Sequence, residues 1–337
     1  MDGTAKNSAG TVVTSAVAGD TITIVANSYA NGKIFDKWMT SAKGVRFENE
    51  EAGTTIFTMP TSAVSVTATY NVFVSAKNFG GATAITGSEV FIENRSLSIS
   101  AIYASDHEVT QKEYETYCKY GGSAPWAKIG LGDNFPAYNV SWYDAVVYCN
   151  LKSLADSLTP CYKLDSSIDT KNWADIVSED GEYCGPSSNN ETWNGITCDW
   201  TSNGWRLPTE AEWEFLARGG NLSTSDGQTT YSGSDIAEIV GWCTGSKSHE
   251  VKGKTANGLN LYDMSGNVWE WCWDFYNTIE FNTAKTGPSV ALYDSDRTRR
   301  GGGFSSGDYF CTVAYRDYIP PYNRNGSTGF RVVRNAQ

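Results

Sequence analysis

The sequence predicts an α+β protein with a small all-β domain at its N-terminus. Residues 11–70 alternate hydrophobic and polar side chains with period two, whereas the capping signals of three helices lie further along the chain. A chain of 337 residues is long enough for one large domain and one small one. We therefore expect a β domain over residues 1–72 and an α+β domain with much irregular structure over residues 73–337.

The N-terminal domain is predicted from short alternating segments that are separated by turns such as Asn31-Gly32. Its runs at residues 35–38, 54–60 and 66–70 resemble the internalin-type B repeats of bacterial surface proteins. The resemblance implies a spacer or a stalk. A small β sandwich of another kind is the alternative, because so plain a pattern has little specificity.

Three helices are predicted in the larger domain by capping boxes, in which an N-cap hydroxyl and a carboxylate three residues later bond each other's backbone. The boxes are Thr110 with Glu113, Ser141 with Asp144, and Thr209 with Glu212. We expect the first helix to end at Gly121-Gly122 and the third at Gly219-Gly220. No helical period persists after the third helix, so short strands and long polar loops are expected there.

Composition limits the partners of the chain. Hydrophobic residues make up 40% and charged residues only 19%, which describes an ordered globular protein. The net charge of −12 opposes attraction to nucleic acid or to an anionic membrane surface. We therefore expect no nucleic-acid partner, and no stretch is apolar enough to predict a transmembrane segment.

The eight cysteines lack the CxxC spacing of zinc sites, and the chain has only two histidines, so zinc is not expected. Cys184 with Cys198 is the most natural disulfide, because the two residues lie across a loop. Cys118 and Cys149 lie on predicted helix faces, where buried thiols are common. The sequence leaves the disulfide connectivity open.

Six motifs of the larger domain occur in an order that resembles the formylglycine-generating-enzyme family, also called sulfatase-modifying factors. They are EVT at 108–110, PAYNVSWYDA at 136–145, WRLPTEAEWEFLA at 205–217, GLNLYDMSGNVWEW at 258–271, RGGGF at 300–304 and GFR at 329–331. The resemblance spans residues 71–337 and implies a variant of the C-type lectin fold.

Most residues of these motifs are expected to be scaffold. Tryptophans supply the bulk that amphipathic helices and buried strands need in a core. The expected core tryptophans are Trp142, Trp205, Trp213, Trp269 and Trp271. We expect Arg206, Glu210, Glu212 and Glu214 to cap and pair rather than to catalyse.

The same resemblance argues against catalysis. Family members that oxidise a substrate cysteine use two cysteines after the RGG motif, and these positions fall on Ser306 and Cys311. A serine hydroxyl titrates far above a thiol and is a poor copper ligand, so we expect no catalytic residue. The alternative is an oxidase, or an iron-dependent oxygenase in which His107 and His249 would have to converge.

The resemblance also implies a structural calcium site around GNVWEW. The matching oxygen donors are the side chains of Asp263 and Glu270 and the carbonyls of Gly266 and Val268, a hard-ligand set suited to calcium. The alternative is a turn that Asp263 stabilises, with Glu270 facing solvent. No other cofactor is expected.

The C-terminal composition is biased. Residues 286–336, 51 in number, contain no Lys, Glu, Gln, Met or Trp, although these types make up 52 of the other 286 residues. At that frequency about nine would be expected. The residue types present are among those that an asparagine codon can reach when its two adenines are freely replaced, whereas the five absent types cannot be reached in that way.

This bias resembles the variable regions that diversity-generating retroelements write by adenine-specific miscopying. A framework that includes Arg300-Gly301-Gly302, Cys311, Arg316, Arg324 and residues 329–332 alternates with clusters of replaceable residues, so a variable region is expected at about 299–330. The candidate ligand-binding residues are Ser305, Ser306, Asp308, Tyr309, Phe310, Tyr315, Asp317, Tyr318, Ile319, Tyr322, Asn323, Asn325, Gly326, Ser327 and Thr328.

Antibody loops use a similar set of residue types, because tyrosine gives rigid contact area at small entropic cost and small polar residues adapt their hydrogen bonds. We expect the tyrosines to anchor a ligand, and Asp308 and Asp317 to accept hydrogen bonds or pair with a basic group. Phe310 and Ile319 have half-burial as an alternative. The arginines nearby are expected to pair locally: Arg297, Arg299 and Arg300 with Asp294 and Asp296.

The predicted function is therefore non-enzymatic binding of an unidentified protein, peptide or glycan ligand, on another cell for example, by a monomer. The resemblances imply a bacterial cell-surface or extracellular location, as in an exported lipoprotein. Besides the enzyme, a structural adhesin or stalk without variable recognition is the remaining alternative.

Overall fold

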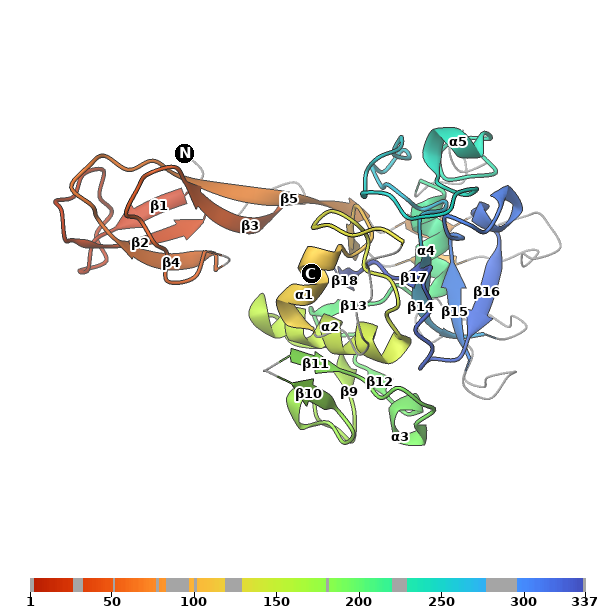
Figure 1. Ribbon diagram of the computed structural model, residues 1–337. Helices are drawn as coiled ribbons and strands as arrows, with labels where there is room; N and C mark the ends of the chain where they lie inside the picture. The colour runs from red at the N-terminus through yellow and green to blue at the C-terminus, as the bar shows by residue number, and fades with distance from the viewer. Residues whose placement is uncertain are drawn as a thin grey trace. The chain divides into compact units, whose positions relative to one another are not determined.

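The computed structural model divides the chain into two compact units, residues 1–73 and 74–337, and each is described by itself (Figure 1). The residues described are 3–26, 33–50, 52–76, 79–82, 97–99, 102–118, 129–179, 182–219, 229–276 and 296–335.

The N-terminal unit consists of strands, as the period-two pattern predicts. One sheet has the antiparallel order β1-β2-β4, with β1 at Gly3–Lys6, β2 at Thr21–Ala26 and β4 at Thr54–Thr58. The strand β3 (Lys33–Thr40) pairs antiparallel with β5 (Val66–Ala76). Alternate residues of these strands meet in one core, which contains Ile22, Ile24, Trp38, Phe57 and Ala68.

The larger unit contains two principal groups of strands. The first has the order β13-β18-β8, formed by Trp205–Arg206, Val333–Asn335 and Ile102–Ser105. The second has the order β16-β15-β14-β17, formed by Arg316–Ile319, Arg297–Arg300, Trp269–Phe275 and Thr328–Gly329. Two-stranded ribbons are β6 (Phe79–Ala82) with β7 (Leu97–Ile99), β9 (Tyr162–Lys163) with β12 (Thr197–Cys198), and β10 (Val177–Glu179) with β11 (Glu182–Cys184).

All three predicted capping boxes are present. They begin α1 (Gln111–Tyr117), α2 (Trp142–Ala155) and α4 (Glu210–Ala217). The first helix ends at Tyr117, before the predicted stop at 121–122, which lies outside the described residues. Short turns complete the unit: η1 (Thr170–Asn172), α3 (Glu191–Asn194), α5 (Ala237–Val240) and η3 (Asp308–Cys311). The expectation of no helix after α4 is therefore wrong for the single turn of α5.

The predicted core tryptophans are confirmed, since all five side chains are buried. Arg206 and Glu212 are also buried. The Arg206 guanidinium donates two hydrogen bonds to the Glu212 carboxylate, at 2.7 and 2.8 Å, in the first turn of α4. This pair confirms the expected capping and pairing role of these residues.

The cysteine side chains do not follow the expected pairing of Cys184 with Cys198. The Cys198 side chain instead lies beside that of Cys161, because β12 pairs with β9 and places Cys198 opposite Tyr162. Cys118 and Cys149 are buried, as predicted.

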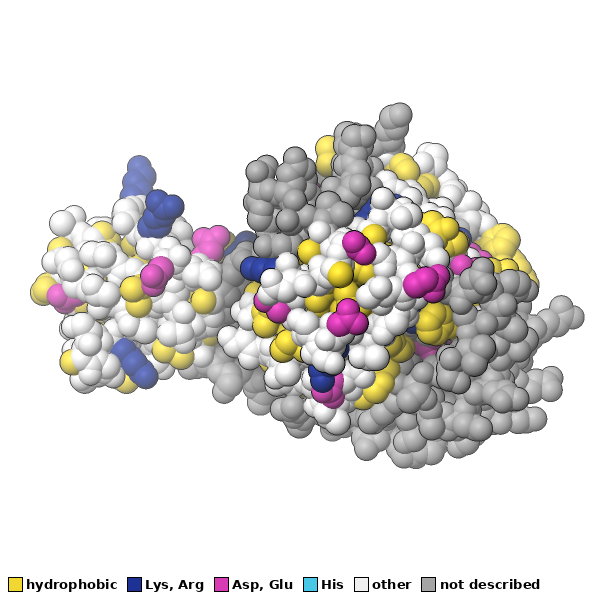
Figure 2. Space-filling model, turned by 90° about the horizontal axis from the view of Figure 1, so that it is seen from below, with side chains coloured by type: hydrophobic (Ala, Val, Ile, Leu, Met, Phe, Trp, Pro, Cys, Tyr) yellow, Lys and Arg dark blue, Asp and Glu magenta, His cyan; other side chains and the backbone are white. Residues whose placement is uncertain are grey.

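No helix among the described residues is long and apolar enough to cross a membrane. On the face drawn in Figure 2, acidic side chains are spread among hydrophobic and neutral ones, and no continuous band of Lys and Arg is visible among the described residues.

The first prediction concerns the cap of α4. Thr209→Val removes the hydroxyl that accepts the Glu212 N–H at 3.1 Å, so the larger unit should lose about 1 kcal/mol of stability. Thermal unfolding should show a lower midpoint than in the wild type. The matched control is Thr192→Val at an exposed position of α3, which should leave the midpoint unchanged; equal effects of the two substitutions would contradict the capping role.

Candidate functional site

The candidate surface lies between β15 and the end of β17. Of the fifteen predicted ligand-binding residues, fourteen are exposed or partly exposed. Most framework residues that lie between these positions are buried, among them Gly301, Cys311, Arg316 and Phe330, whereas Thr312, Ala314 and Arg324 are partly exposed. The chain thus alternates between side chains that hold the segment to the core and side chains that reach solvent.

Thr328 is the exception, and its assignment to the surface is wrong. Its side chain is buried because β17 pairs in parallel with β14, where Thr328 lies opposite Trp269. Its hydroxyl oxygen accepts a hydrogen bond from Arg299 at 2.8 Å. Thr328 is therefore a scaffold residue.

Aromatic side chains gather at one part of the surface. Tyr309, Phe310 and Tyr315 contact one another edge to face, with ring centroids 4.9 to 5.4 Å apart. Tyr309 is 62% exposed and Phe310 is 38% exposed. Close aromatic packing restricts these rings before any ligand arrives, and each still offers a hydrophobic edge or face to solvent.

The two candidate aspartates differ in what they can do. Asp317 receives two hydrogen bonds from Arg299 on its Oδ2, at 2.6 and 2.9 Å, so its charge is already balanced within the chain, and its role toward a ligand stays a prediction. Asp308 is exposed, and no ion pair joins it to another described residue. It remains available to a ligand.

The three neighbouring arginines have contacts beyond the predicted local pairs. Arg299 pairs with Asp317, and Arg300 pairs with Glu214 at 2.5 Å. The Arg297 guanidinium instead lies over the rings of Trp142 and Phe275, and burial lowers its pKa to about 9. The proposed partner Asp294 lies outside the described residues.

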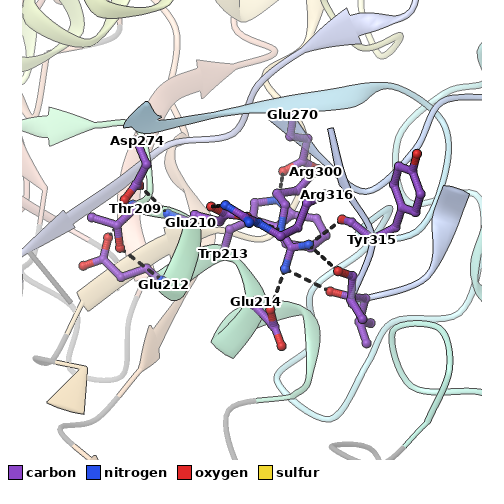
Figure 3. A network of polar contacts seen from close by, with 12 residues as sticks. Thr209, Glu210, Glu212, Trp213, Glu214, Glu270, Asp274, Arg300, Tyr315 and Arg316 are labelled. Carbon is purple, nitrogen blue, oxygen red and sulfur yellow. Dashed lines mark hydrogen bonds and ion pairs between the residues drawn. The ribbon is translucent and has the colours of Figure 1, made fainter. Parts of the chain in front are cut away.

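A buried network under the surface explains how these loops are held (Figure 3). Arg300 is fully buried and joins helix α4 through Glu214. Its guanidinium also donates to the carbonyl oxygens of Val313, Ala314 and Tyr315. One arginine therefore fixes three consecutive peptide groups of the variable segment without using any of its side chains.

Arg316 makes the second link to α4, through two hydrogen bonds to the Glu210 carboxylate. The Glu210 N–H in turn donates to Asp274 at 2.7 Å. Burial and the charge of Glu210 raise the pKa of Asp274 to about 7. The backbone and the side chain of Glu210 thus connect β14, α4 and β16.

Two further arginines fix the end of the segment. Arg324 makes a bidentate pair with Asp144, with both bonds at 2.8 Å, and Asp144 is the capping carboxylate of α2. Arg331 makes a bidentate pair with Glu270 at 2.6 and 2.7 Å, and both side chains are fully buried. These carboxylates come from the part of the chain before residue 286, and the arginines come from the biased window.

Ser306 and Cys311 occupy the two positions predicted to match the catalytic cysteines of the family's enzymes, and each has a structural contact in this protein. The Ser306 hydroxyl accepts the Gly303 N–H at 2.9 Å, so it has a structural role in the loop. Cys311 is fully buried and shares a small buried cluster with Cys243. Sequence reasoning missed Cys243, because it is distant in the chain and outside every motif.

The two histidines have separate surroundings. The His107 ring lies between Asp106, at 2.5 Å, and Glu113, at 3.4 Å. The His249 ring stacks on Trp242 with centroids 3.7 Å apart. In the described part of the chain, no group of three or more His, Cys, Asp or Glu side chains could hold a metal ion.

The donors predicted for calcium fit only in part. Both Glu270 oxygens accept hydrogen bonds from Arg331, and one also accepts from Trp213, so this carboxylate is already neutralised and does not face solvent. One oxygen of the Asp263 carboxylate is buried without a hydrogen-bond partner in the described structure. Asp263 therefore suits a cation, Glu270 does not, and the calcium site stays a prediction.

The second prediction tests the buried network. Glu210→Gln leaves the Arg316 guanidinium buried without its counter-charge, which typically costs about 3 kcal/mol or more. Denaturant unfolding should show this loss. Asp308→Asn, an equally conservative change on the exposed surface, should change stability by no more than about 0.5 kcal/mol. A Glu210→Gln protein as stable as Asp308→Asn would show that the network does not hold the fold.

The third prediction concerns Asp263, whose pKa burial raises to about 6. The folded state holds this proton more tightly than the unfolded state, so stability should fall as pH rises from about 4 to 6. Asp263→Asn removes that loss and should be the more stable protein at pH 7, by up to about 3 kcal/mol. Melting curves of both proteins across this pH range test this, with Asp308→Asn as control; if added calcium chloride abolished the difference, Asp263 would be a calcium ligand.

Known proteins agree with this architecture. The sulfatase-modifying factor enzyme 1-like domain matches residues 57–336, and the divergent InlB B-repeat domain matches residues 3–73. Two solved structures are similar over most of the chain. The Treponema denticola variable protein 1 is 27% identical with a TM-score of 0.62, covering 89% of this chain and 99% of that one. CarF is 28% identical with a TM-score of 0.56, covering 79% and 98%.

Among curated proteins, the chaperone protein LppX of Paenibacillus barcinonensis is 30% identical over 72% of this chain and 83% of its own length. The formylglycine-generating enzyme of Streptomyces coelicolor is 32% identical over 43% of this chain, a match that spans about half of that enzyme. The predicted α+β fold of the C-type lectin variant and the predicted likeness to a variable protein are confirmed. The chain belongs to the sulfatase-modifying factor, or formylglycine-generating-enzyme, family.

Proposed function

We propose that this protein is a non-enzymatic receptor whose variable C-terminal segment binds a ligand. One observation carries the proposal: within the biased window, fourteen of the fifteen candidate variable side chains reach solvent at least in part, and most framework side chains are buried. Replaceable residues would not coincide with exposed positions unless the exposed positions were the ones free to change. The likeness to a treponemal variable protein supports the same conclusion.

The chemistry of the surface favours a protein, a peptide or a glycan as ligand. The rings of Tyr309, Phe310 and Tyr315 offer a hydrophobic platform of the kind that dominates binding energy in protein interfaces. Asp308 beside them adds an acceptor for a hydroxyl, amide or ammonium group. The net charge of −12 acts against nucleic acid.

The location that fits this function is the bacterial cell surface. Residues 3–73 match the divergent InlB B-repeat domain, which as a spacer would carry the receptor away from the cell. We propose that the protein is exported to this surface as a lipoprotein. It acts there as a monomer. A stalk or adhesin with no variable recognition would need only this spacer and not the aromatic surface.

Catalysis is the second candidate, because the family includes enzymes and Cys311 is retained at the second catalytic position. Ser306 at the first position removes the thiol that the family's copper chemistry needs. Purified protein with added copper should therefore form no aldehyde on a cysteine-containing substrate peptide, as measured by hydrazide labelling. Aldehyde formation above the level of a Cys311→Ala variant would overturn the non-enzymatic assignment.

The fourth prediction tests the receptor directly. A display library that randomises the twelve exposed or partly exposed candidate positions other than Ser306 and Asp317, whose side chains make structural contacts, should retain folded protein at nearly the wild-type frequency, since these side chains contribute little to the core. A matched library at buried framework positions, including Gly302, Arg316 and Arg331, should lose most folded members. Selection of the first library on an arbitrary protein target should yield binders, and comparable folding losses in both libraries would refute a tolerant surface.

The source of the variation has its own test. The DNA next to the gene should contain a near-identical copy of the segment that encodes about residues 299–330, with adenines at the codons of the variable positions. A locus without such a repeat would leave the fold and its surface intact but remove the retroelement as the origin of the bias.

A further inference from the structure

Two cysteines from distant parts of the chain meet beneath the variable surface. Cys243 follows α5, and Cys311 ends the short turn η3. The two side chains share a small buried cluster with Ala237, and the Cys243 thiol raises the pKa of the neighbouring Cys311 thiol. Cys311 is also the only cysteine of residues 286–336, whereas Cys243 lies outside that window.

The backbone around the two thiols is already held together. The Gly307 N–H donates to the Cys243 carbonyl at 2.8 Å, and the Gly245 N–H donates to the Phe304 carbonyl at 2.5 Å. At Gly302, which has a φ of +75°, a β-carbon would lie only 2.7 Å from the Cys311 sulfur. Glycine there makes room for the Cys311 sulfur in the packed turn.

We propose that Cys243 and Cys311 form a disulfide in the mature protein, which ties the variable turn η3 to the constant loop after α5. The family's oxidation chemistry pairs the position of Cys311 with the position of Ser306, so this pairing is a different one that serves structure. The inference goes beyond the receptor function and does not depend on any ligand.

The proposed oxidant is a small-molecule disulfide, such as oxidised glutathione. The Cys243 thiolate attacks one of its sulfurs, which forms a mixed disulfide and releases one glutathione thiol. The Cys311 thiolate then attacks the Cys243 sulfur and releases the second glutathione. The two protein thiols lose two electrons and two protons in total, and the oxidant takes them up as two glutathione thiols.

The surroundings of the two thiols determine that Cys243 attacks the oxidant first. Cys243 lines a solvent-connected cavity of about 270 Å³, together with Trp242, Phe304 and Asp308, so a small disulfide can reach it. Cys311 does not line that cavity. The neighbouring Cys243 thiol and burial raise the pKa of the Cys311 thiol, which makes it a poor first nucleophile.

A bond at this place would restrict the loop that carries Tyr309 and Phe310, both of which lie in η3. A loop that is held before binding loses less conformational freedom when a ligand arrives. The disulfide would thus hold the backbone of η3 fixed while the side chains on it change.

The test uses the full chain, incubated with mixtures of oxidised and reduced glutathione, alkylated, digested and analysed by mass spectrometry. We expect a cross-linked peptide pair containing residues 243 and 311, lighter by two hydrogens than the reduced pair, and a higher melting midpoint in the oxidised protein. Cys243→Ser should lose both the cross-link and the rise in midpoint, with Cys311 then found alkylated.

The control is Cys161→Ser, which removes a thiol from the other facing pair, Cys161 with Cys198, and should retain the cross-link. Circular dichroism establishes that each variant is folded. Should either serine variant not fold, the wild-type cross-link map still decides. Free, alkylated Cys243 and Cys311 in fully oxidised wild type, or a cross-link of either residue to another cysteine only, would overturn the proposal.

Discussion

The larger unit depends on buried arginine–carboxylate pairs that join its C-terminal segment to the rest of the domain. Arg300, Arg316, Arg324 and Arg331 bond carboxylates on α4, α2 and β14. A buried pair of this kind adds little net stability, but it is costly to break, and it is strongly directional. The pairs therefore specify where the segment lies, and the tryptophan-rich core supplies the hydrophobic stabilisation.

The division of charge within these pairs agrees with the composition of the chain. Arginine is among the residue types that the biased window can contain, whereas glutamate is not. Each cation of the network accordingly lies in the window, and each of its glutamates lies outside. The side chains at variable positions take little part in the network, apart from Asp317 with Arg299. The surface can therefore change in chemistry while its supports stay the same.

Local signals in the sequence predicted much of this structure. The capping boxes at Thr110, Ser141 and Thr209 depend on residues three apart, so they could be read directly. The biased composition located the exposed positions, because a side chain that tolerates replacement must lie outside the core.

Contacts between residues that are distant in the sequence were not predicted correctly. The partner of Arg299 is Asp317 and not a neighbouring aspartate, since strand register brings β15 and β16 side by side. Thr328 is buried because β17 lies parallel to β14, and no local pattern shows that. The thiol contact between Cys243 and Cys311 likewise follows from the fold and not from any spacing.

The strands that bound the variable segment carry a consequence for how it can evolve. The chain enters the segment from β15 and leaves it through β17, and both strands flank β14 in one sheet. The loop between them thus has fixed ends, and Arg316 and Arg324 fix it again at intermediate points. An insertion or a deletion between these points would shift the following arginines out of reach of their carboxylates. Change at this surface must therefore proceed by exchanging one residue for another at constant length, which is the kind of change that base substitution produces.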